Sequence, residues 1–459
     1  MSVTLLKALG SAYLGCFLFG YHMGVVNAAL PDIAVTLAFA GSPATQGKVV
    51  SSTLLGAFVG SLAGGSLADS LGRRRSLQGN ALLLAAGALL CALAPSVPVL
   101  LSGRLLAGIG IGAAGSIAPL YVAESAPAAL RGKLGSFNQM AICVGVLAAI
   151  TAGLPVGGGA QGVVTALGGS GLPWWRVMFG ISLLPALAQT ALLLLSTESP
   201  KWLAQNGRGS EAADVAAKLW GEGGATLAEN KDSARSESSG AGWCELLQAK
   251  YCWGAAIGVL LFAFQQFAGI NAVVFFSTKV FADAGVSSAV AASCLVMATN
   301  IAGTAVASSA VDKLGRKPLL IGSFSGMAAA MLFMAANMRR ATTAATAASS
   351  AGLVSLVGTV GYILAFALGV GPIPSLLLGE MMPAALRGKA AAAAMASHWV
   401  CTFAVGQWFL PATAAFGNAA VYAVFGSIAA MGALFVALAV PETKSPPAAA
   451  ATARLVSAD

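Results

Sequence analysis

The chain has 459 residues, of which 58% are hydrophobic and only 9% are charged. Soluble domains carry roughly 25% charged residues, so this composition excludes an ordinary soluble protein and indicates a membrane protein. The formal net charge of +9 does not indicate a nucleic-acid partner, because the basic residues follow the topology of the predicted membrane spans.

Apolar runs that are long enough to cross a bilayer, about 20 residues each, recur along the whole chain. They predict an all-α membrane protein with about twelve transmembrane helices. The first run is similar to a signal peptide, but we interpret it as a membrane span because no small-residue cleavage site is evident. No Arg- and Ser-rich leader precedes it, so we expect no organelle-targeting segment in this chain. The runs begin near Leu5, Val49, Leu77, Val97, Leu134, Trp174, Trp253, Ser287, Pro318, Ala351, Gly388 and Asn418.

The charges are divided unevenly between the two sides of the predicted membrane. With a cytoplasmic amino terminus, one side receives most of the Lys and Arg residues, and the positive-inside rule identifies that side as the cytosol or its equivalent. Both termini and the central loop are then expected on that side. The opposite side receives only Lys48, Arg104, Arg176, Lys279, Arg339 and Arg340, and some of these can be embedded in the spans.

Two charged motifs occur twice, about half a chain length apart. Residues 65–77 read GSLADSLGRRRSL, and residues 308–320 read SSAVDKLGRKPLL. The second pair is ESAPAALRGK at 124–133 and EMMPAALRGK at 380–389. Parallel repeats of this size are typical of transporters whose halves move about a central site. The sequence therefore predicts a duplication of six spans into two six-helix halves.

The most polar stretch of the chain lies between these halves. Its first part has helical periodicity over residues 212–219, and its second part, GEGGATLAENKDSARSESSG, is typical of a flexible linker. A second outlying loop at 153–171 is rich in glycine, and we expect it to be mobile on the opposite face. The predicted organisation is an N-terminal half at 1–196, a cytoplasmic linker at 197–250, a C-terminal half at 251–444 and a tail at 445–459.

The repeated charges lie where spans meet the basic side of the membrane. Carboxylates and arginines at matching places in both halves predict an ion-pair lattice that holds the halves closed and breaks when they open. We expect Asp69 to pair with Arg131, and Glu124 to pair with Arg75 or a neighbour. The alternative is that these charges only set topology and anchor helix ends. The candidate gate residues are Asp69, Arg73, Arg75, Glu124, Arg131, Asp312, Arg316, Glu380 and Arg387.

The segment FAFQQFAGINAVVFF carries three amides, Gln265, Gln266 and Asn271, inside a predicted span. Polar side chains at this depth are costly unless they face protein or a watery cavity, so they are candidates for function. A regular helix would point them in separate directions, but Gly269 allows the helix to break. The alternative is interhelical bonding that only holds the bundle together. The echo of GINAV in GVVNA places Asn27 opposite Asn271.

These motifs together resemble one family over nearly the whole chain. The segments GSLADSLGRRR, GRLLAGIGIG, PLYVAESAPAALRG, TESPKWL, QQFAGINAV, GPIPS and PETK are similar to the sugar porter family of the major facilitator superfamily. Within it, FGYHMGVVNAAL and SHW most resemble the plastidic glucose transporters of plants and algae. The resemblance implies the major facilitator fold and alternating-access transport of a neutral hexose, with glucose expected. It also implies residence in the plastid inner envelope, with the plasma membrane as the alternative.

The resemblance also implies which side chains contact the sugar. Amides both donate and accept, which suits hydroxyl groups, and an aromatic face suits the apolar surface of a sugar ring. Two departures from the family put the selectivity in question, because Ser375 stands where a Trp often follows GPIP and Ala367 stands where many members have an acidic residue. The implied contacts are Gln139, Gln265, Gln266, Asn271, Asn300 and Trp399.

Proton coupling is the open question at this site. Proton-coupled relatives usually carry Asp where this chain has His22, and no carboxylate is predicted in the middle of the membrane. We therefore expect facilitated diffusion. The alternative is a proton symporter in which His22 or His398 titrates, since the reference pKa of histidine, about 6.5, suits a switch. Both histidines are accordingly candidate binding residues, and protons are an alternative partner.

Other function classes find little support in the sequence. No nucleotide-binding loop, metal-ligand cluster or nucleophile and base spacing appears, so we expect no enzyme, cofactor or metal. The seven cysteines are scattered and show no redox or metal spacing. A sugar receptor would need a long signalling tail, which is not evident. The expected partners are a sugar and the lipid bilayer, and another monosaccharide or a polyol remains an alternative substrate.

Overall fold

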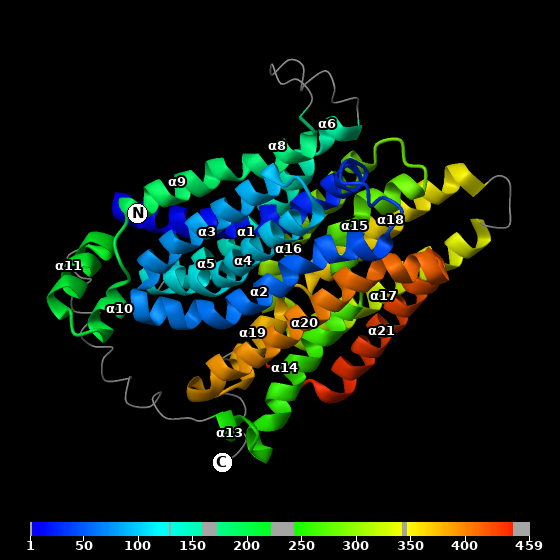
Figure 1. Ribbon diagram of the computed structural model, residues 1–459. Helices are drawn as coiled ribbons and strands as arrows, with labels where there is room; N and C mark the ends of the chain where they lie inside the picture. Colours follow the sequence, from blue (N-terminus) through cyan, green and yellow to red (C-terminus); the bar gives the residue numbers. More distant parts are fainter. Residues whose placement is uncertain (1, 128–129, 158–171, 222–242, 342–346, 444–459) are drawn as a thin grey trace, which may run out of the picture.

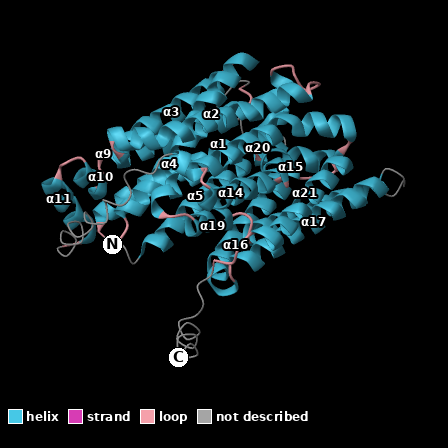
Figure 2. Cartoon of the chain, turned by 90° about the horizontal axis from the view of Figure 1, so that it is seen from below, coloured by secondary structure: helices cyan, strands magenta, loops and turns pink. Residues whose placement is uncertain are grey.

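The computed structural model describes residues 2–127, 130–157, 172–221, 243–341 and 347–443. Within these ranges the regular elements are all helices, and they form one elongated bundle (Figure 1, Figure 2). Twelve helical segments are long and apolar enough to cross a membrane. The predicted all-α membrane fold is therefore confirmed.

The first half of the chain forms six spans. The sixth consists of two helices in line, α8 and α9, which together make one span at Trp174–Leu194. The helices are α1 (Val3–Thr36), α2 (Pro43–Leu71), α3 (Arg73–Leu93), α4 (Val97–Ser125), α5 (Arg131–Thr151), the short α6 (Leu154–Gly157), α8 (Trp174–Ile181) and α9 (Leu183–Leu194).

The polar stretch after these spans carries three short helices, α10 (Pro200–Gln205), α11 (Gly209–Trp220) and α13 (Trp243–Leu246). Two hydrogen bonds tie α11 to the first half. The indole of Trp220 donates to the Ser125 carbonyl at 2.8 Å, and the Ser2 hydroxyl donates to the Leu219 carbonyl at 3.2 Å. The predicted flexible part of the linker and most of the glycine-rich loop lie outside the described residues.

The second half of the chain forms the other six spans. Two of these spans are interrupted, and each interruption separates two helices that continue in the same direction (Figure 1). The helices are α14 (Ala249–Phe267), α15 (Ile270–Asp283), α16 (Ala289–Leu314), α17 (Arg316–Ala341), α18 (Ala347–Leu368), α19 (Ile373–Met381), α20 (Ala384–Phe416) and α21 (Asn418–Ala439).

The seventh span breaks at Gly269, as the sequence predicts. Gly269 has a φ of 97°, in the left-handed region that favours glycine, and a side chain there would meet the ring of Phe425. The break leaves a carbonyl at Ala268 without its usual helical partner, and the hydroxyl of Tyr362 donates to it at 3.0 Å. The second break, between α18 and α19, was not predicted.

Among the described residues, the two halves pack against each other mainly through α1 with α15, α2 with α20 and α5 with α16, with a smaller contact between α6 and α16. The repeated charged motifs lie at one end of the bundle, here called the basic end, where Arg73, Arg131, Arg316 and Arg387 are found. The amino terminus, α10, α11 and α13 lie at the same end (Figure 1). The exact boundaries of the halves and the linker remain a prediction.

Candidate functional site

The three amides of the broken seventh span lie in one hydrogen-bonded chain. Gln265 Nε2 donates to the Val370 carbonyl at 2.6 Å, and Gln266 Nε2 donates to Gln265 Oε1 at 2.9 Å. Gln266 Nε2 also contacts His398 Nδ1 at 2.8 Å, and Asn271 Nδ2 donates to Gln266 Oε1. We call Gln265, Gln266, Asn271 and His398 the amide cluster. It joins α14, α15 and α20 to the turn that follows α18.

The amide cluster is buried, and each of its three amides is less than 10% exposed. Buried amides need hydrogen-bond partners, and these amides find them in one another. Thr402 extends the cluster, since its hydroxyl accepts from Asn271 Nδ2 at 3.4 Å and donates to the His398 carbonyl at 2.7 Å. The interhelical hydrogen bonding that the sequence left as an alternative is therefore present in the structure.

Gln139 and Asn300 meet at a shared neighbour and not in the amide cluster. Gln139 Nε2 donates to Cys143 Sγ at 3.6 Å within α5, and Asn300 Nδ2 reaches the same sulfur at 4.0 Å from α16. These helices belong to different halves, so the contact lies on the boundary between the halves. Among the hydrogen bonds of the described residues, none joins this pair directly to the amide cluster.

Trp399 lies between the amide cluster and the first half. Its ring centroid is 5.0 Å from that of His398 and 6.2 Å from that of Phe19 on α1. The indole is 3% exposed, and its Nε1 has no hydrogen-bond partner among the described residues. A buried donor without a partner is unusual, so this N–H group is available to a polar ligand.

His22 is buried on α1, and its Nε2 finds no partner among the described residues. Arg104 lies next to it, because Arg104 Nη1 donates to the His22 carbonyl at 3.0 Å and Nε donates to the Val49 carbonyl at 3.3 Å. Arg104 is 1% exposed. The sequence placed Arg104 among the charges opposite the basic side, some of which can be embedded, and in the structure α4 carries its side chain into the interior. His22 is not joined to the amide cluster by any contact of the described residues.

The sequence shows Asn27 only at the repeat position that matches Asn271. In the structure Asn27 forms hydrogen bonds of its own with α15. Its Nδ2 donates to the Val274 carbonyl at 2.5 Å and to Ser277 Oγ at 2.9 Å, and its Oδ1 accepts from the Thr278 backbone N–H at 3.1 Å. One side chain of α1 thus satisfies both a donor and an acceptor of the α15 backbone. Asn27 therefore links the two halves toward the end of the bundle opposite the basic end.

The two departures from the family pattern have simple surroundings. Ala367 is 1% exposed and faces Gly303 of α16, so a larger acidic side chain would need that contact to open. The hydroxyl of Ser375 donates to the Pro372 carbonyl at 3.1 Å in the first turn of α19. The hydroxyl is exposed in this structure and forms no contact with the amide cluster.

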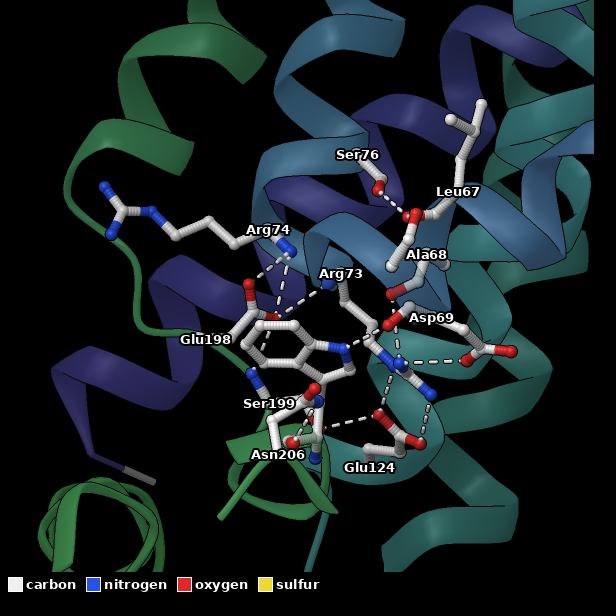
Figure 3. A network of polar contacts seen from close by, with 12 residues as sticks. Leu67, Ala68, Asp69, Arg73, Arg74, Ser76, Glu124, Glu198, Ser199 and Asn206 are labelled. Atoms are coloured by element: carbon white, nitrogen blue, oxygen red, sulfur yellow. Dashed lines mark hydrogen bonds and ion pairs between the residues drawn. The ribbon is translucent and has the colours of Figure 1, made fainter. Parts of the chain in front are cut away.

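The charged residues of the first half form a compact group at the basic end (Figure 3). Arg73 binds Glu124 through two hydrogen bonds, of 2.8 Å from Nε and 3.2 Å from Nη2. Its Nη1 lies 3.1 Å from Asp69 Oδ1. Ser199 Oγ donates to Glu124 Oε2 at 2.6 Å. With Glu198, we call Arg73, Glu124 and Ser199 the N network.

Glu198 joins the N network by capping helix α3. Residue Gly72 precedes that helix and has no side chain to cap it, so the carboxylate of Glu198 accepts from the N–H groups of Arg73 at 2.9 Å and Arg74 at 3.1 Å. Burial raises the pKa of the Glu198 carboxyl, while the N–H groups of Ser199, Arg74 and Arg73 act in the opposite direction. Glu198 was not predicted as part of this group.

The second half carries a matching group, the C network, formed by Arg316, Glu380, Glu442 and Thr443. Arg316 Nη2 lies 2.9 Å from Glu380 Oε1, and the Thr443 hydroxyl donates to the other oxygen of Glu380. Glu442 accepts from the N–H groups of Arg316 and Lys317, each at 3.1 Å, at the start of α17. The repeat thus extends to TESPKWL and PETK, whose glutamates were not predicted to belong to the charged groups.

The pairs in these networks differ in part from those predicted. Asp69 pairs with Arg73 and not with Arg131, and Glu124 pairs with Arg73, a neighbour of Arg75. Arg387 Nη2 donates only to the Met382 carbonyl, at 3.4 Å, among the described contacts. The ion pairs that the described residues of these two networks form lie within each half. The side chain of Asp312 lies outside the described residues.

Comparison with known proteins identifies the family of this chain. Residues 8–452 match the family model described as Sugar (and other) transporter. The chain is 46% identical over 446 residues to "Plastidic glucose transporter 4" of Arabidopsis thaliana, which covers 96% of this chain and 79% of the relative. It is 33% identical to the "Glucose transporter GlcP" of Staphylococcus epidermidis, covering 94% of this chain and 93% of that protein.

Solved structures agree with the sequence relatives. The xylose transporter XylE of Escherichia coli in a "partially occluded inward open conformation" matches with a TM-score of 0.81 and 29% identity, over 97% of this chain and all of that one. The same protein, a major facilitator superfamily proton:xylose symporter, bound to 6-bromo-6-deoxy-D-glucose, matches with a TM-score of 0.74 and 31% identity. That match covers 96% of this chain and 97% of the other. The chain therefore belongs to the sugar transporter family within the major facilitator superfamily, and it is a multi-pass membrane carrier of sugars and not an enzyme.

Proposed function

We propose that this protein carries a neutral hexose, and glucose in particular, across a membrane by alternating access. The single observation that best supports glucose is the 46% identity with a plastidic glucose transporter across nearly the whole chain. The amide cluster agrees with this proposal, because neutral amides can donate and accept hydrogen bonds with hydroxyl groups and offer no charge that would favour an ionic solute.

The proposed sugar site includes Gln139, Gln265, Gln266, Asn271, Asn300, Trp399 and His398. Its amides are already bonded to one another, so a sugar would replace protein hydrogen bonds with equivalent ones and would leave no buried amide unpaired. The open Nε1 donor of Trp399 and its apolar ring would then meet both the hydroxyls and the C–H surface of a hexose. The gathering of Gln139 and Asn300 around this site is a proposal, since they meet at Cys143 in this structure.

We propose that the structure represents a state open toward the basic end. The named hydrogen bonds between halves, such as Ser51 Oγ to Gln407 Oε1 at 2.7 Å and those of Asn27, lie in the middle or at the opposite end. At the basic end, the ion pairs of the N network and C network stay within their own halves. The higher TM-scores with inward-open conformations of XylE, 0.81 and 0.79, support the same assignment. The basic end would face the cytosol or plastid stroma.

We propose facilitated diffusion as the transport mode. His22 stands where an acidic proton carrier is expected, and Arg104, equally buried, donates to its carbonyl. A proton on His22 would place a second buried positive charge beside the first, which is costly at this depth. Proton symport is the second candidate, because the relatives include a "D-xylose-proton symporter" of Escherichia coli at 33% identity. We propose the plastid envelope as the location, from the plastidic names of two Arabidopsis thaliana relatives at 46% and 42% identity.

Counterflow of labelled glucose in proteoliposomes, with and without a pH gradient, tests these proposals. Glucose counterflow that does not respond to the gradient would support a glucose carrier that is not proton-coupled. Accumulation driven by an inward proton gradient would replace facilitated diffusion with symport. Absence of glucose counterflow, together with counterflow of xylose or a polyol in the same vesicles, would show that the substrate is that other sugar or polyol and not glucose. His22→Asp serves as a gain-of-coupling variant, and we expect it to acquire pH-dependent uptake.

A further inference from the structure

The break in the tenth span exposes a backbone carbonyl to the amide cluster. Between α18 and α19 the chain reads GVGP, and Pro372 cannot continue the helical hydrogen bonds of the preceding turn. The Val370 carbonyl accepts the Gln265 amide at 2.6 Å, and the Gly371 carbonyl lies at 3.5 Å from the same nitrogen. The Val370 N–H is held by the Ser323 hydroxyl at 2.9 Å, so the turn is fixed to α17.

A backbone carbonyl can only accept, and this fixes the direction of the whole chain of amides. The end of Gln265 that faces Val370 must be its NH2 group, so its oxygen faces Gln266. The atom of Gln266 at 2.9 Å from that oxygen must therefore be its own NH2 group. The oxygen of Gln266 then faces Asn271, which must donate to it. No amide in this chain can flip without placing two donors or two acceptors against each other.

The donor and acceptor order of the amides also fixes the hydrogen bond to the imidazole of His398. The Gln266 NH2 group lies 2.8 Å from His398 Nδ1, so Nδ1 must accept and cannot carry a hydrogen. In the neutral ring the hydrogen then lies on Nε2. Two aromatic rings hold the imidazole in place, since Phe262 and Trp399 meet it edge-on with centroids at 5.6 and 5.0 Å.

We propose that the Val370 carbonyl, acting through Gln265 and Gln266, locks His398 into the tautomer with the hydrogen on Nε2, so that His398 offers the transported sugar a hydrogen-bond donor only. Gln265 is a positioning residue in this arrangement, and His398 is a specificity-determining residue for the hydroxyl it faces. The tautomer does not depend on the identity of the substrate, whereas the role toward the sugar rests on the proposed function.

The tautomer can be measured directly because the chain contains only two histidines. Nitrogen NMR of histidine-labelled protein in lipid nanodiscs separates protonated from unprotonated ring nitrogens, and His398→Phe assigns the signals by removing one set. We expect His398 Nε2 to be protonated and Nδ1 to be unprotonated at neutral pH. A protonated Nδ1, alone or together with Nε2, would overturn the proposal whether or not the protein transports glucose.

Two variants test the origin of the lock. In Gln265→Met the Gln266 amide loses its fixed direction, and we expect a second His398 tautomer to appear; an unchanged spectrum would refute the role of the Val370 carbonyl. Gln266→Met removes the direct bond and should have the same effect, which covers the case in which the first variant fails to fold. Gln407→Met is the matched control, because it removes an amide from the same helix α20, bonded to Ser51, and should leave His398 unchanged.

Sugar analogues test the consequence for transport. A fluorine atom can accept a hydrogen bond but cannot donate one, so at the hydroxyl that faces His398 a fluoro-glucose should compete better than the matching deoxy-glucose. One neutral hydrogen bond corresponds to a ratio of roughly 3 to 10 in inhibition constants. His398→Phe should bring that ratio to one. Equal competition by both analogues at every position of the wild-type protein would overturn the specificity role and leave glucose transport itself intact.

Discussion

The N network and the C network contain the same residue types at repeated positions, but they differ in burial. In each, an arginine at the start of a helix binds one glutamate, and a second glutamate caps that helix. The residue after the capping glutamate, Ser199 or Thr443, donates its hydroxyl to the glutamate that the arginine binds. The side chains of Arg73 and Glu124 are each 4% exposed, whereas those of Arg316 and Glu380 are 15% and 32% exposed. Trp202 of α10 lies beside the N network and donates to the Asp69 carbonyl at 2.8 Å.

The sequence repeat preserves the hydrogen-bond partners, but because burial differs, we expect the two ion pairs to contribute different amounts to stability. Two exposed charges remain solvated when their pair breaks, so the pair contributes little. Two buried charges have lost their water, and removal of one partner leaves the other uncompensated. The N network should therefore act as a rigid joint within its half, while the C network should open at lower cost.

The largest expected effect comes from removing the central glutamate of each network. Glu124→Ala leaves the guanidinium of Arg73 buried without its two-bond partner, with the exposed Asp69 and the capping carboxylate of Glu198 as the remaining negative charges, and should cost about 3–5 kcal/mol. Glu380→Ala should cost about 1 kcal/mol or less, because its partner Arg316 can reach water. Thermal unfolding of the purified variants in one detergent measures the difference.

The control for this pair of variants is Glu211→Ala on α11. Glu211 forms an exposed ion pair with Arg208 at 2.6 Å, with side chains about half exposed. The Glu211→Ala variant should leave the melting temperature nearly unchanged. Equal losses in Glu124→Ala and Glu380→Ala would show that burial in this structure does not distinguish the two networks.

The next effect concerns the hydroxyls that bind these glutamates. Ser199→Ala removes a bond of 2.6 Å to a buried carboxylate, and hydrogen bonds to charged groups contribute about 1.5–3 kcal/mol. Thr443→Ala removes the equivalent bond to Glu380 in more exposed surroundings and should cost less. Unfolding of the two variants, alone and combined with alanine at the matching glutamate, gives the coupling within each network. A larger coupling in the C network would reverse the comparison.

Much of the fold could be predicted from the sequence because it depends on local features. Apolar length alone gives the spans, and Gly269 marks the break in the seventh span because only glycine adopts its φ of 97° without strain. The break at Val370 was missed, although GPIP was noticed, because the proline was interpreted as part of a family motif and not as the end of a helix.

The partners of charged side chains were harder to predict than the spans. Near the end of a span, successive residues point about 100° apart, so the choice between Arg73 and Arg75 for Glu124 depends on the exact helix rotation. Glu198 and Glu442 follow their networks' arginines by a long stretch of chain, and only the folded bundle brings them to the starts of α3 and α17. Which of the charges opposite the basic side are embedded could not be predicted, because the burial of Arg104 depends on its contacts with carbonyls of α1 and α2.

A third test concerns the glycines that precede the two networks, where we expect no difference. Gly72 and Gly315 have nearly the same conformation, with φ of 92° and 93°, and ψ of 159° and 165°. This region is almost closed to other residues, and a side chain there would also meet the capping carboxylate of Glu198 or Glu442. Gly72→Ala and Gly315→Ala should each cost about 1–3 kcal/mol, by the same measurement. A large inequality would mean that backbone strain also differs between the repeats.

The smallest expected effect is a pH dependence carried by Glu198. Burial raises the pKa of this carboxyl in the folded protein above its ordinary value of about 4.3. The folded state therefore binds the proton more tightly than the unfolded state, and the resulting stabilisation is complete below about pH 4.3 and is lost as the pH rises through the folded pKa. Glu198→Gln removes this titration, so the melting temperature of the wild type relative to the variant should fall as the pH rises from about 4 and then level off.

Glu211→Gln provides a control of opposite sign for this measurement. The hydrogen bond from Arg208 lowers the pKa of Glu211, so its contribution is present above the ordinary pKa and is lost as the pH falls. The two difference curves should therefore slope in opposite directions over the same pH range. A Glu198 curve that rises with pH would mean that the N–H groups at the start of α3 outweigh burial, so that the N network prefers its capping carboxylate charged.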